Sequence, residues 1–198
     1  MIAQQSLHRF LDELAGSAPT PGGGSAAALM GAMGAALVSM VCNLTIGRKG
    51  YEGEEAEMRQ TLEQAEALRQ RLTAMIEADV QAFDGLMAAY KLPRASEQEK
   101  TSRTHAVQQA LKQATDVPLG CAEACAEVIE LARRVAPIGN RNVISDAGVA
   151  SLAAYAGLRS AALNVAINAP SIQDADFVRS RREQRMGSSC VRSNQRRA

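Results

Sequence analysis

The feature that most constrains the fold of this chain is a run of 21 residues, 26–46, that contains no charged side chain. It is dominated by Ala, Gly and Ser, and three consecutive glycines precede it. The run is long enough to cross a bilayer, but it has few Leu, Ile or Phe residues and no basic flank on its N-terminal side. Small side chains on every face allow neighbouring helices to approach closely. We therefore predict a central buried helix over residues 24–46, and no membrane span.

The rest of the chain shows helical periodicity and no strand-like alternation. We expect helices over residues 7–14 and 54–90, from the capping box at Ser96 to Val135, and from a cap at Ser145 or Asp146 to Asn168. Pro118 should start or kink a new helical piece, and the polar stretch GNRNVISDAG should form a loop. The chain is thus predicted to be all-α: a single domain of five to six mostly antiparallel helices, bundle-like, around the Ala/Gly-rich helix.

Composition narrows the classes of ligand and site. Apolar residues make up 46% of the chain and charged residues 22%, whereas aromatic residues make up only 3%, so few rings are available to stack on a flat ligand. The four cysteines, without a secretory signal peptide, indicate reduced thiols and a cytoplasmic location. Cys121 and Cys125 lie one helical turn apart with no further Cys or His nearby. We interpret them as core thiols and expect no metal site.

The C-terminal segment differs from the rest of the chain. Residues 177–198 contain seven Arg and one Glu and show almost no apolar periodicity. Burying these guanidinium groups without matching carboxylates is costly, and little apolar surface is present to offset the entropy of ordering. We therefore divide the chain into a helical domain, residues 1–176, and an Arg-rich tail, residues 177–198, predicted to be disordered from Val178 onward. A nucleic-acid-binding arm is disfavoured, because no partnering motif accompanies it.

The segment PGGGS opens the uncharged helix with Pro21, Gly22, Gly23, Gly24 and Ser25. A glycine-rich turn at a helix N-terminus presents several backbone N–H groups at the positive end of the helix dipole, which suits an anionic ligand. The segment is not a P-loop, because no Gly-Lys-Ser/Thr follows, and it is not a dinucleotide fingerprint, because no strand precedes it. One glycine would satisfy a tight turn. Three in a row favour close approach by a ligand or by another stretch of backbone.

Seven blocks occur in order along the chain: PTPGGGSAAA, GAMGAALVSMV, IGRKGY, DVQAFDGLMAAYKLP, TDVPL, GNRNVISD and LNVAIN. Together they resemble the cyclodeaminase domain of formiminotransferase-cyclodeaminase and its stand-alone relatives, the methenyltetrahydrofolate cyclohydrolases, over about residues 3–176. The resemblance implies an all-helical homodimer with a folate site near the subunit interface, and a tetrahydrofolate derivative as substrate without a prosthetic group or nucleotide. Related proteins continue past this point with another amphipathic helix, from which the Arg-rich tail departs.

The resemblance implies hydrolysis of 5,10-methenyltetrahydrofolate to 10-formyltetrahydrofolate, a step of one-carbon metabolism. The alternative within the family is formiminotetrahydrofolate cyclodeaminase, which closes the ring and releases ammonia. Both reactions pass through a tetrahedral carbon between N5 and N10, so a pocket built for one is nearly built for the other. An alternative of a different class is a helical scaffold that has kept the fold without catalysis.

Either reaction needs a group that transfers a proton, and a carboxylate near the cationic carbon also stabilises its charge. Asp79 is the first candidate because it lies close to the apolar stripe of its helix, where it would be partly desolvated. Asp84 is a weaker candidate, and Asp146 either takes part or only caps its helix. Lys49 is a candidate for protonating the leaving nitrogen. His8 and His105 lie outside the family blocks and are disfavoured.

Polar side chains within the family blocks are candidates for binding the substrate. Arg48 and Lys49 follow the central helix, where they either complement its dipole or bind the glutamate carboxylates of folate, the role that we prefer for them. The pterin edge would be bound by amide and hydroxyl groups from Asn140, Asn142 and Ser145. Asn164 and Asn168 lie in an otherwise apolar helix, where burial requires a hydrogen-bond partner. That partner is either the ligand or a neighbouring helix.

Overall fold

The computed structural model describes residues 2–190, and these residues form six α-helices and no strand. The helices are α1 (Leu7–Leu14), α2 (Gly23–Asn43), α3 (Glu55–Tyr90), α4 (Glu97–Val135), α5 (Ile144–Asn168) and α6 (Ala175–Cys190), joined by short 3-10 turns. The prediction of an all-α fold with five to six helices is confirmed.

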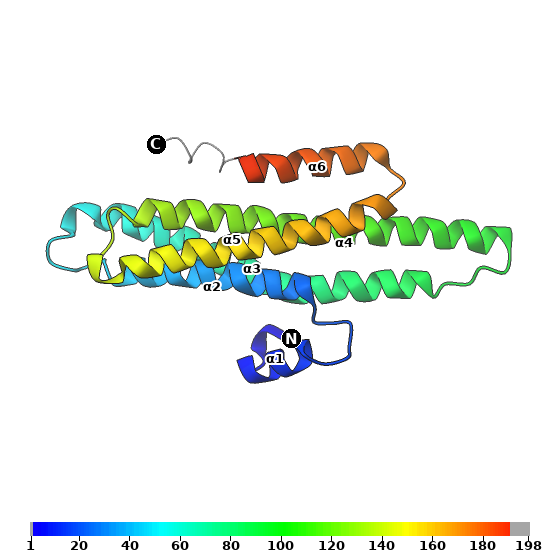
Figure 1. Cartoon of the computed structure of the whole chain (residues 1–198), viewed down its shortest axis with the longest axis horizontal. Coiled ribbons are helices and arrows are strands. Elements are labelled where there is room, and N and C mark those ends of the chain that lie inside the picture. Colours follow the sequence, from blue (N-terminus) through cyan, green and yellow to red (C-terminus); the bar gives the residue numbers. More distant parts are fainter. Residues whose placement is uncertain (1, 191–198) are drawn as a thin grey trace.

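Helices α2 to α5 form an elongated bundle in which consecutive helices run in opposite directions (Figure 1). Helices α3 and α4 are the longest, and they project beyond α2 as an antiparallel hairpin. Helix α6 lies along one side of this bundle, and α1 lies on the opposite side (Figure 1). Helix α2 packs against α3, α4 and α5, so the predicted central position of the uncharged helix is confirmed.

Glycine allows α2 and α5 to pack closely. A β-carbon placed on Gly34 would lie 2.8 Å from the carbonyl oxygen of Ala150, and one placed on Gly157 would lie 2.8 Å from that of Ala27. Both distances are far shorter than a van der Waals contact.

Helix α2 is long and apolar enough to cross a membrane, but 61% of its most hydrophobic 18-residue window is buried inside the bundle. That burial is what a core helix requires.

Pro118 does not start a new helix, because α4 runs through it without interruption. A proline inside a helix provides no N–H for the carbonyl four residues earlier, which here belongs to Ala114. The side-chain amide of Asn168 on α5 donates a hydrogen bond to that carbonyl oxygen, at 2.7 Å. Pro118 itself is buried against the neighbouring helices. A partner from another helix therefore compensates for the missing backbone hydrogen bond.

The start of α5 also differs from the prediction. Part of the expected loop is helical, since residues Arg141–Val143 form a 3-10 turn and α5 begins at Ile144. Ser145 and Asp146 consequently lie inside the first turn of α5, and neither is its N-cap. Asn140 caps the 3-10 turn instead, with its side-chain oxygen accepting a hydrogen bond from the backbone N–H of Asn142 at 3.1 Å.

Residues 178–190 were predicted to be disordered, whereas the structure places them in helix α6. The sequence of this segment does not show which groups on other helices contact it. Phe177 and Val178 pack against a small apolar cluster that includes Leu86 and Leu111. The guanidinium group of Arg181 pairs with the carboxylate of Asp116 on α4 at 2.6 Å. Residues 191–198 of the predicted disordered tail lie outside the described residues.

Candidate active site

The glycine segment and Asp79 meet at the N-terminus of α2. Gly22 is the N-cap residue, and α2 begins at Gly23. A β-carbon placed on Gly24 would lie 2.0 Å from Oδ1 of Asp79, so only glycine permits the carboxylate to approach this position. A β-carbon on Gly23, by contrast, would meet nothing within 4 Å. The sequence predicted close approach by a ligand or by another stretch of backbone, whereas the group beside Gly24 is a side chain of α3. Approach by a ligand stays a prediction.

Ser25 binds the Asp79 carboxylate directly. Its hydroxyl group lies 2.8 Å from Oδ2 of Asp79 and 3.3 Å from the carbonyl oxygen of Ile76. Ser25 is completely buried, whereas Asp79 is half-buried. The carboxylate thus lies at the positive end of α2, with one oxygen bound to the protein and part of its surface open to solvent. This arrangement suits a group that accepts a proton from a water molecule or stabilises a cation.

Two buried thiols, Cys121 and Cys125, lie on α4, and Cys121 is near this carboxylate. A hydrogen bond with Cys125 and burial, together with the nearby charge of Asp79, raise the pKa of Cys121 far above its usual range. Burial also raises the pKa of Cys42 to about 11. Thiols held in the protonated form are poor nucleophiles and poor metal ligands. Within residues 2–190, no cluster of three or more His, Cys, Asp and Glu side chains is arranged to hold a metal ion.

The other predicted catalytic and binding residues lie at the opposite end of α2. Arg48 and Lys49 follow the C-terminus of α2, while Ser145 and Asp146 belong to the first turn of α5. Asn140 holds the connection between α4 and α5 against the end of α2. Since α5 runs antiparallel to α2, the first turn of α5 also lies at this end. Helix α2 has 21 residues, so at about 1.5 Å per residue the two groups of candidates are roughly 30 Å apart.

Asn140 is buried and has a structural role at this end. Its backbone N–H donates to the hydroxyl of Thr45 at 3.0 Å, and its side-chain amide donates to the carbonyl oxygen of Leu44 at 3.0 Å. The hydroxyl of Tyr51 accepts a hydrogen bond from the backbone of Arg141 at 3.1 Å. Sequence reasoning missed Thr45 and Tyr51. Both lie in or beside the IGRKGY block, which is the one signal that could have drawn attention to them.

Asn164 and Asn168 lie in the last turns of α5, near the Asp79 end of the bundle. Their position follows from the packing of Gly157 against Ala27 near the start of α2. The side-chain amide of Asn164 donates to the carbonyl of Ser160 on its own helix at 3.1 Å. Asn168 binds the carbonyl of Ala114, as described above. Hydrogen bonding within the protein therefore accounts for both amide groups, and their role in substrate binding stays a prediction.

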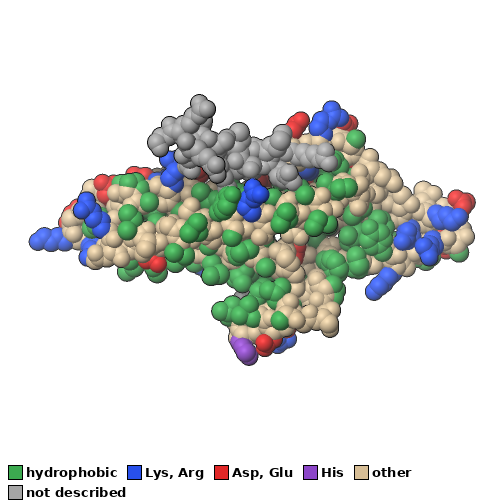
Figure 2. Space-filling model, in the orientation of Figure 1, with side chains coloured by type: hydrophobic (Ala, Val, Ile, Leu, Met, Phe, Trp, Pro, Cys, Tyr) green, Lys and Arg blue, Asp and Glu red, His purple; other side chains and the backbone are tan. Residues whose placement is uncertain are grey.

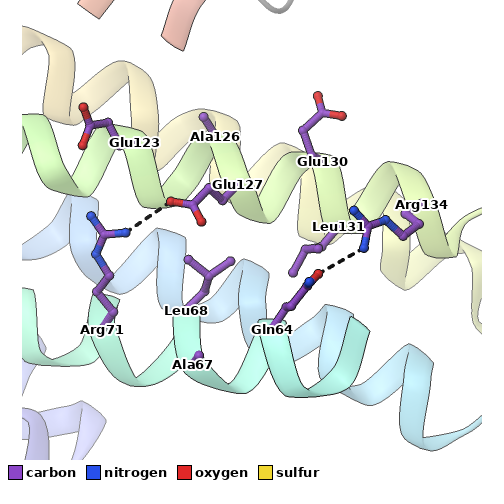
Figure 3. Close-up of a pocket in the computed structure, with 10 residues that line it drawn as sticks. All are labelled: Gln64, Ala67, Leu68, Arg71, Glu123, Ala126, Glu127, Glu130, Leu131 and Arg134. Atoms are coloured by element: carbon purple, nitrogen blue, oxygen red, sulfur yellow. Dashed lines mark hydrogen bonds and ion pairs between the residues drawn. The ribbon is translucent and has the colours of Figure 1, made fainter. Parts of the chain in front are cut away.

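A groove of about 780 Å³ lies elsewhere, between α3 and α4 (Figure 3). Its base contains Leu68 and Leu131, and charged side chains form its rim. Arg71 pairs with Glu127 at 3.2 Å, and Arg134 donates to the side-chain oxygen of Gln64 at 3.0 Å (Figure 3). None of the predicted site residues lines this groove. Asp79, which the sequence predicts to transfer the proton, lies outside the groove.

The chain is similar to known proteins both in sequence and in structure. The family model described as formiminotransferase-cyclodeaminase matches residues 6–186. A methenyltetrahydrofolate cyclohydrolase from Methylorubrum extorquens is 60% identical over 181 residues, which cover 91% of this chain and 87% of that protein. The formimidoyltransferase-cyclodeaminase of Rattus norvegicus is 36% identical over 176 residues, which cover 89% of this chain but only 32% of the rat protein. A solved structure of formiminotetrahydrofolate cyclodeaminase from Thermotoga maritima superposes with a TM-score of 0.86 and 34% identity, covering 96% of this chain and 91% of that one.

Proposed function

Because this chain belongs to the formiminotransferase-cyclodeaminase family, we propose that it hydrolyses 5,10-methenyltetrahydrofolate to 10-formyltetrahydrofolate. The observation that carries the assignment is the half-buried Asp79 carboxylate, held by Ser25 at the glycine-rich start of α2. The 60% identity to a protein named for this activity, against 36% and 34% for the named cyclodeaminases, favours the hydrolase.

Asp79 provides the proton transfer that the hydrolysis needs. A water molecule adds to the cationic carbon between N5 and N10 while the carboxylate of Asp79 takes one of its protons. The bond from this carbon to N5 then breaks, and Asp79 returns the proton to N5. The remaining hydroxyl loses its proton to solvent as the formyl carbonyl forms on N10. Before the water adds, the negative charge of Asp79 also stabilises the cationic substrate.

Purified protein and two substrates separate the candidate functions. With 5,10-methenyltetrahydrofolate, the hydrolase consumes the methenyl absorbance faster than buffer alone does. With the formimino substrate, a cyclodeaminase produces that absorbance and releases ammonia. Protein that carries out neither reaction but binds a tetrahydrofolate analogue in calorimetry is a binding protein. Protein that does none of these under reducing conditions is a scaffold, and the proposal is then wrong.

The protein is further proposed to act as a homodimer. On α2, apolar residues that are half-buried or exposed recur at alternating spacings of three and four, and α5 adds several exposed ones beside them. The residues are Ala26, Met30, Met33, Leu37 and Met40 on α2, Leu44 directly after it, and Val149, Leu152, Leu163 and Ile167 on α5. We call this surface the α2/α5 face. Figure 2 shows hydrophobic side chains gathered along the middle of the molecule, where this face lies. An apolar stripe of this length matches a second copy of itself across a two-fold axis.

An antiparallel pairing of the two α2 helices would bring together the two groups of candidate site residues. The end that carries Arg48, Lys49 and Asp146 in one subunit would then lie beside Asp79 of the other. In this arrangement the cations bind the glutamate carboxylates of folate, while Asp79 faces the reacting carbon. Lys49 then lies at the distal end of the substrate, away from the leaving nitrogen. Each site consequently requires both subunits.

Two experiments test the dimer. Light scattering after size exclusion should show a dimer that Leu152→Glu dissociates, because it places a charge in the α2/α5 face. Leu7→Glu, a similarly exposed position on α1 outside this face, should leave the dimer intact.

Co-expressed Asp79→Asn and Arg48→Ala subunits should regain activity that neither variant has alone, since one site of the mixed dimer is then complete. A monomeric wild type, or the absence of complementation, would contradict the shared site.

The proposed location is the cytoplasm. Cys42, Cys121 and Cys125 are free buried thiols, which supports a reducing compartment. The enzyme is further proposed to need no metal or prosthetic group, to have no membrane association and to have no nucleic-acid partner. Fractionation of the native source with detection of the protein tests the location.

A further inference from the structure

We propose that Ser25 is a positioning residue that holds the Asp79 carboxyl group in one orientation in both of its protonation states. This inference rests on the proposed role of Asp79 in proton transfer. The sequence alone placed Ser25 among the substrate-binding residues. Its side chain is completely buried, however, so it cannot touch a substrate that approaches from solvent, and it acts on the reaction through Asp79.

The hydroxyl of Ser25 has two protein acceptors within reach. It lies 2.8 Å from Oδ2 of Asp79 and 3.3 Å from the carbonyl oxygen of Ile76. A hydroxyl group offers one hydrogen to donate and two lone pairs that accept. When Asp79 is ionised, Ser25 donates to the carboxylate. When Oδ1 carries a proton taken from water, Oδ2 is still an acceptor, and Ser25 continues to donate to it.

The Ser25–Oδ2 hydrogen bond is therefore present in both states, and the heavy atoms stay in place. Ile76 and Asp79 belong to the same helix, three residues apart, so the second acceptor moves together with the acid. On the other side, glycine at position 24 gives Oδ1 room, because a β-carbon there would lie 2.0 Å from this oxygen. Ser25 engages Oδ2, which leaves Oδ1 to receive the proton of the attacking water molecule.

Other groups around Asp79 do not replace this contact. The first turn of α2 carries no charge, and the 3-10 turn Ile2–Gln4 that packs against α3 is also uncharged. On α4, the Cys121 thiol is buried and stays protonated, as shown above. On α3 itself, Glu77 accepts a hydrogen bond from the backbone of Ile2 at 2.9 Å, and Arg71 pairs with Glu127.

The test compares Ser25→Ala with Ser39→Ala, a control on the same helix. Ser39 is also buried, and its hydroxyl donates to the carbonyl of Ala35 at 3.2 Å, far from Asp79. Loss of the hydrogen bond to the carboxylate disfavours its charged form. The Ser25→Ala enzyme should therefore lose about tenfold in kcat with little change in KM, and the acidic limb of its kcat–pH profile should move to higher pH. Ser39→Ala should match the wild type in kcat and in profile.

Ser25→Cys guards against a Ser25→Ala protein that fails to fold. The thiol is a weak donor, so this variant should show an intermediate kcat and an intermediate position of the acidic limb. Wild-type kcat and profile in either folded Ser25 variant would overturn the positioning role. Asp79→Asn is measured alongside. An inactive Asp79→Asn enzyme with an unchanged Ser25→Ala profile refutes this inference alone, whereas a fully active Asp79→Asn enzyme refutes the proposed role of Asp79.

Discussion

Replacing Asn168 with alanine should destabilise the protein through one backbone carbonyl on a different helix. Pro118 provides no N–H for the carbonyl of Ala114, and the side chain of Asn168 donates to it at 2.7 Å. A buried acceptor left without a partner costs about 1–3 kcal/mol. This hydrogen bond is partly buried, so we expect a loss of about 1–2 kcal/mol. For a chain of this size, that loss lowers Tm by about 2–8 °C.

The double mutant with Pro118→Ala isolates this mechanism. The Pro118→Ala substitution restores the N–H, which binds the carbonyl of Ala114 within α4. Asn168→Ala should then cost less than half as much as it does beside proline, a difference that a double-mutant cycle measures by thermal or urea unfolding. Asn164→Ala serves as the matched control, because its amide binds the carbonyl of Ser160, which the helix backbone already satisfies. An equal loss in the wild-type and Pro118→Ala backgrounds would refute the reasoning.

Three further predictions concern the glycine segment, the metal-free chemistry and α6. Gly24→Ala should lower kcat at least tenfold, because its β-carbon would lie 2.0 Å from Asp79 Oδ1; Gly23→Val should keep the wild-type melting temperature and weaken folate binding. A Gly23→Val protein that is largely unfolded would assign that glycine to structure. Activity should survive exhaustive chelation, and loss that one metal restores would contradict this. Phe177→Ala should release α6 and expose it to limited proteolysis, because Phe177 packs on the cluster around Leu86 and Leu111; unchanged cleavage would show that the contact is not needed.

The sequence was sufficient to predict the helices whose signal is local. The uncharged run and the capping box at Ser96 identified α2 and the start of α4, and the capping box is present in the structure. Periodicity alone could not predict α4 through Pro118, since the compensating amide comes from a residue 50 positions later in the chain. The order in α6 likewise depends on Asp116 and on the small apolar cluster, which are brought near it only by the folded hairpin of α3 and α4.

The candidate site was predicted in part. Asp79 and the glycine segment, 54 positions apart for the Ser25–Asp79 pair, are brought together by the fold, but the pairing of Gly24 with the carboxylate has no signature in a single sequence. The family blocks also grouped Asp79 with Arg48, Asn140 and Asp146, which lie at the other end of α2. The order of the blocks along the chain does not show that these residues lie at opposite ends of α2, and it carries no signal for the shared site that we propose.

The most direct test of the account is the rate at which purified protein consumes 5,10-methenyltetrahydrofolate, with wild type and Asp79→Asn measured side by side. Asparagine keeps the shape of the side chain but removes its charge and its ability to accept a proton. We predict that the wild type hydrolyses the substrate well above the buffer rate, and that Asp79→Asn loses about 10²–10⁴-fold in kcat with little change in KM. Equal rates for the two proteins would show that Asp79 is only a helix residue and would contradict the account.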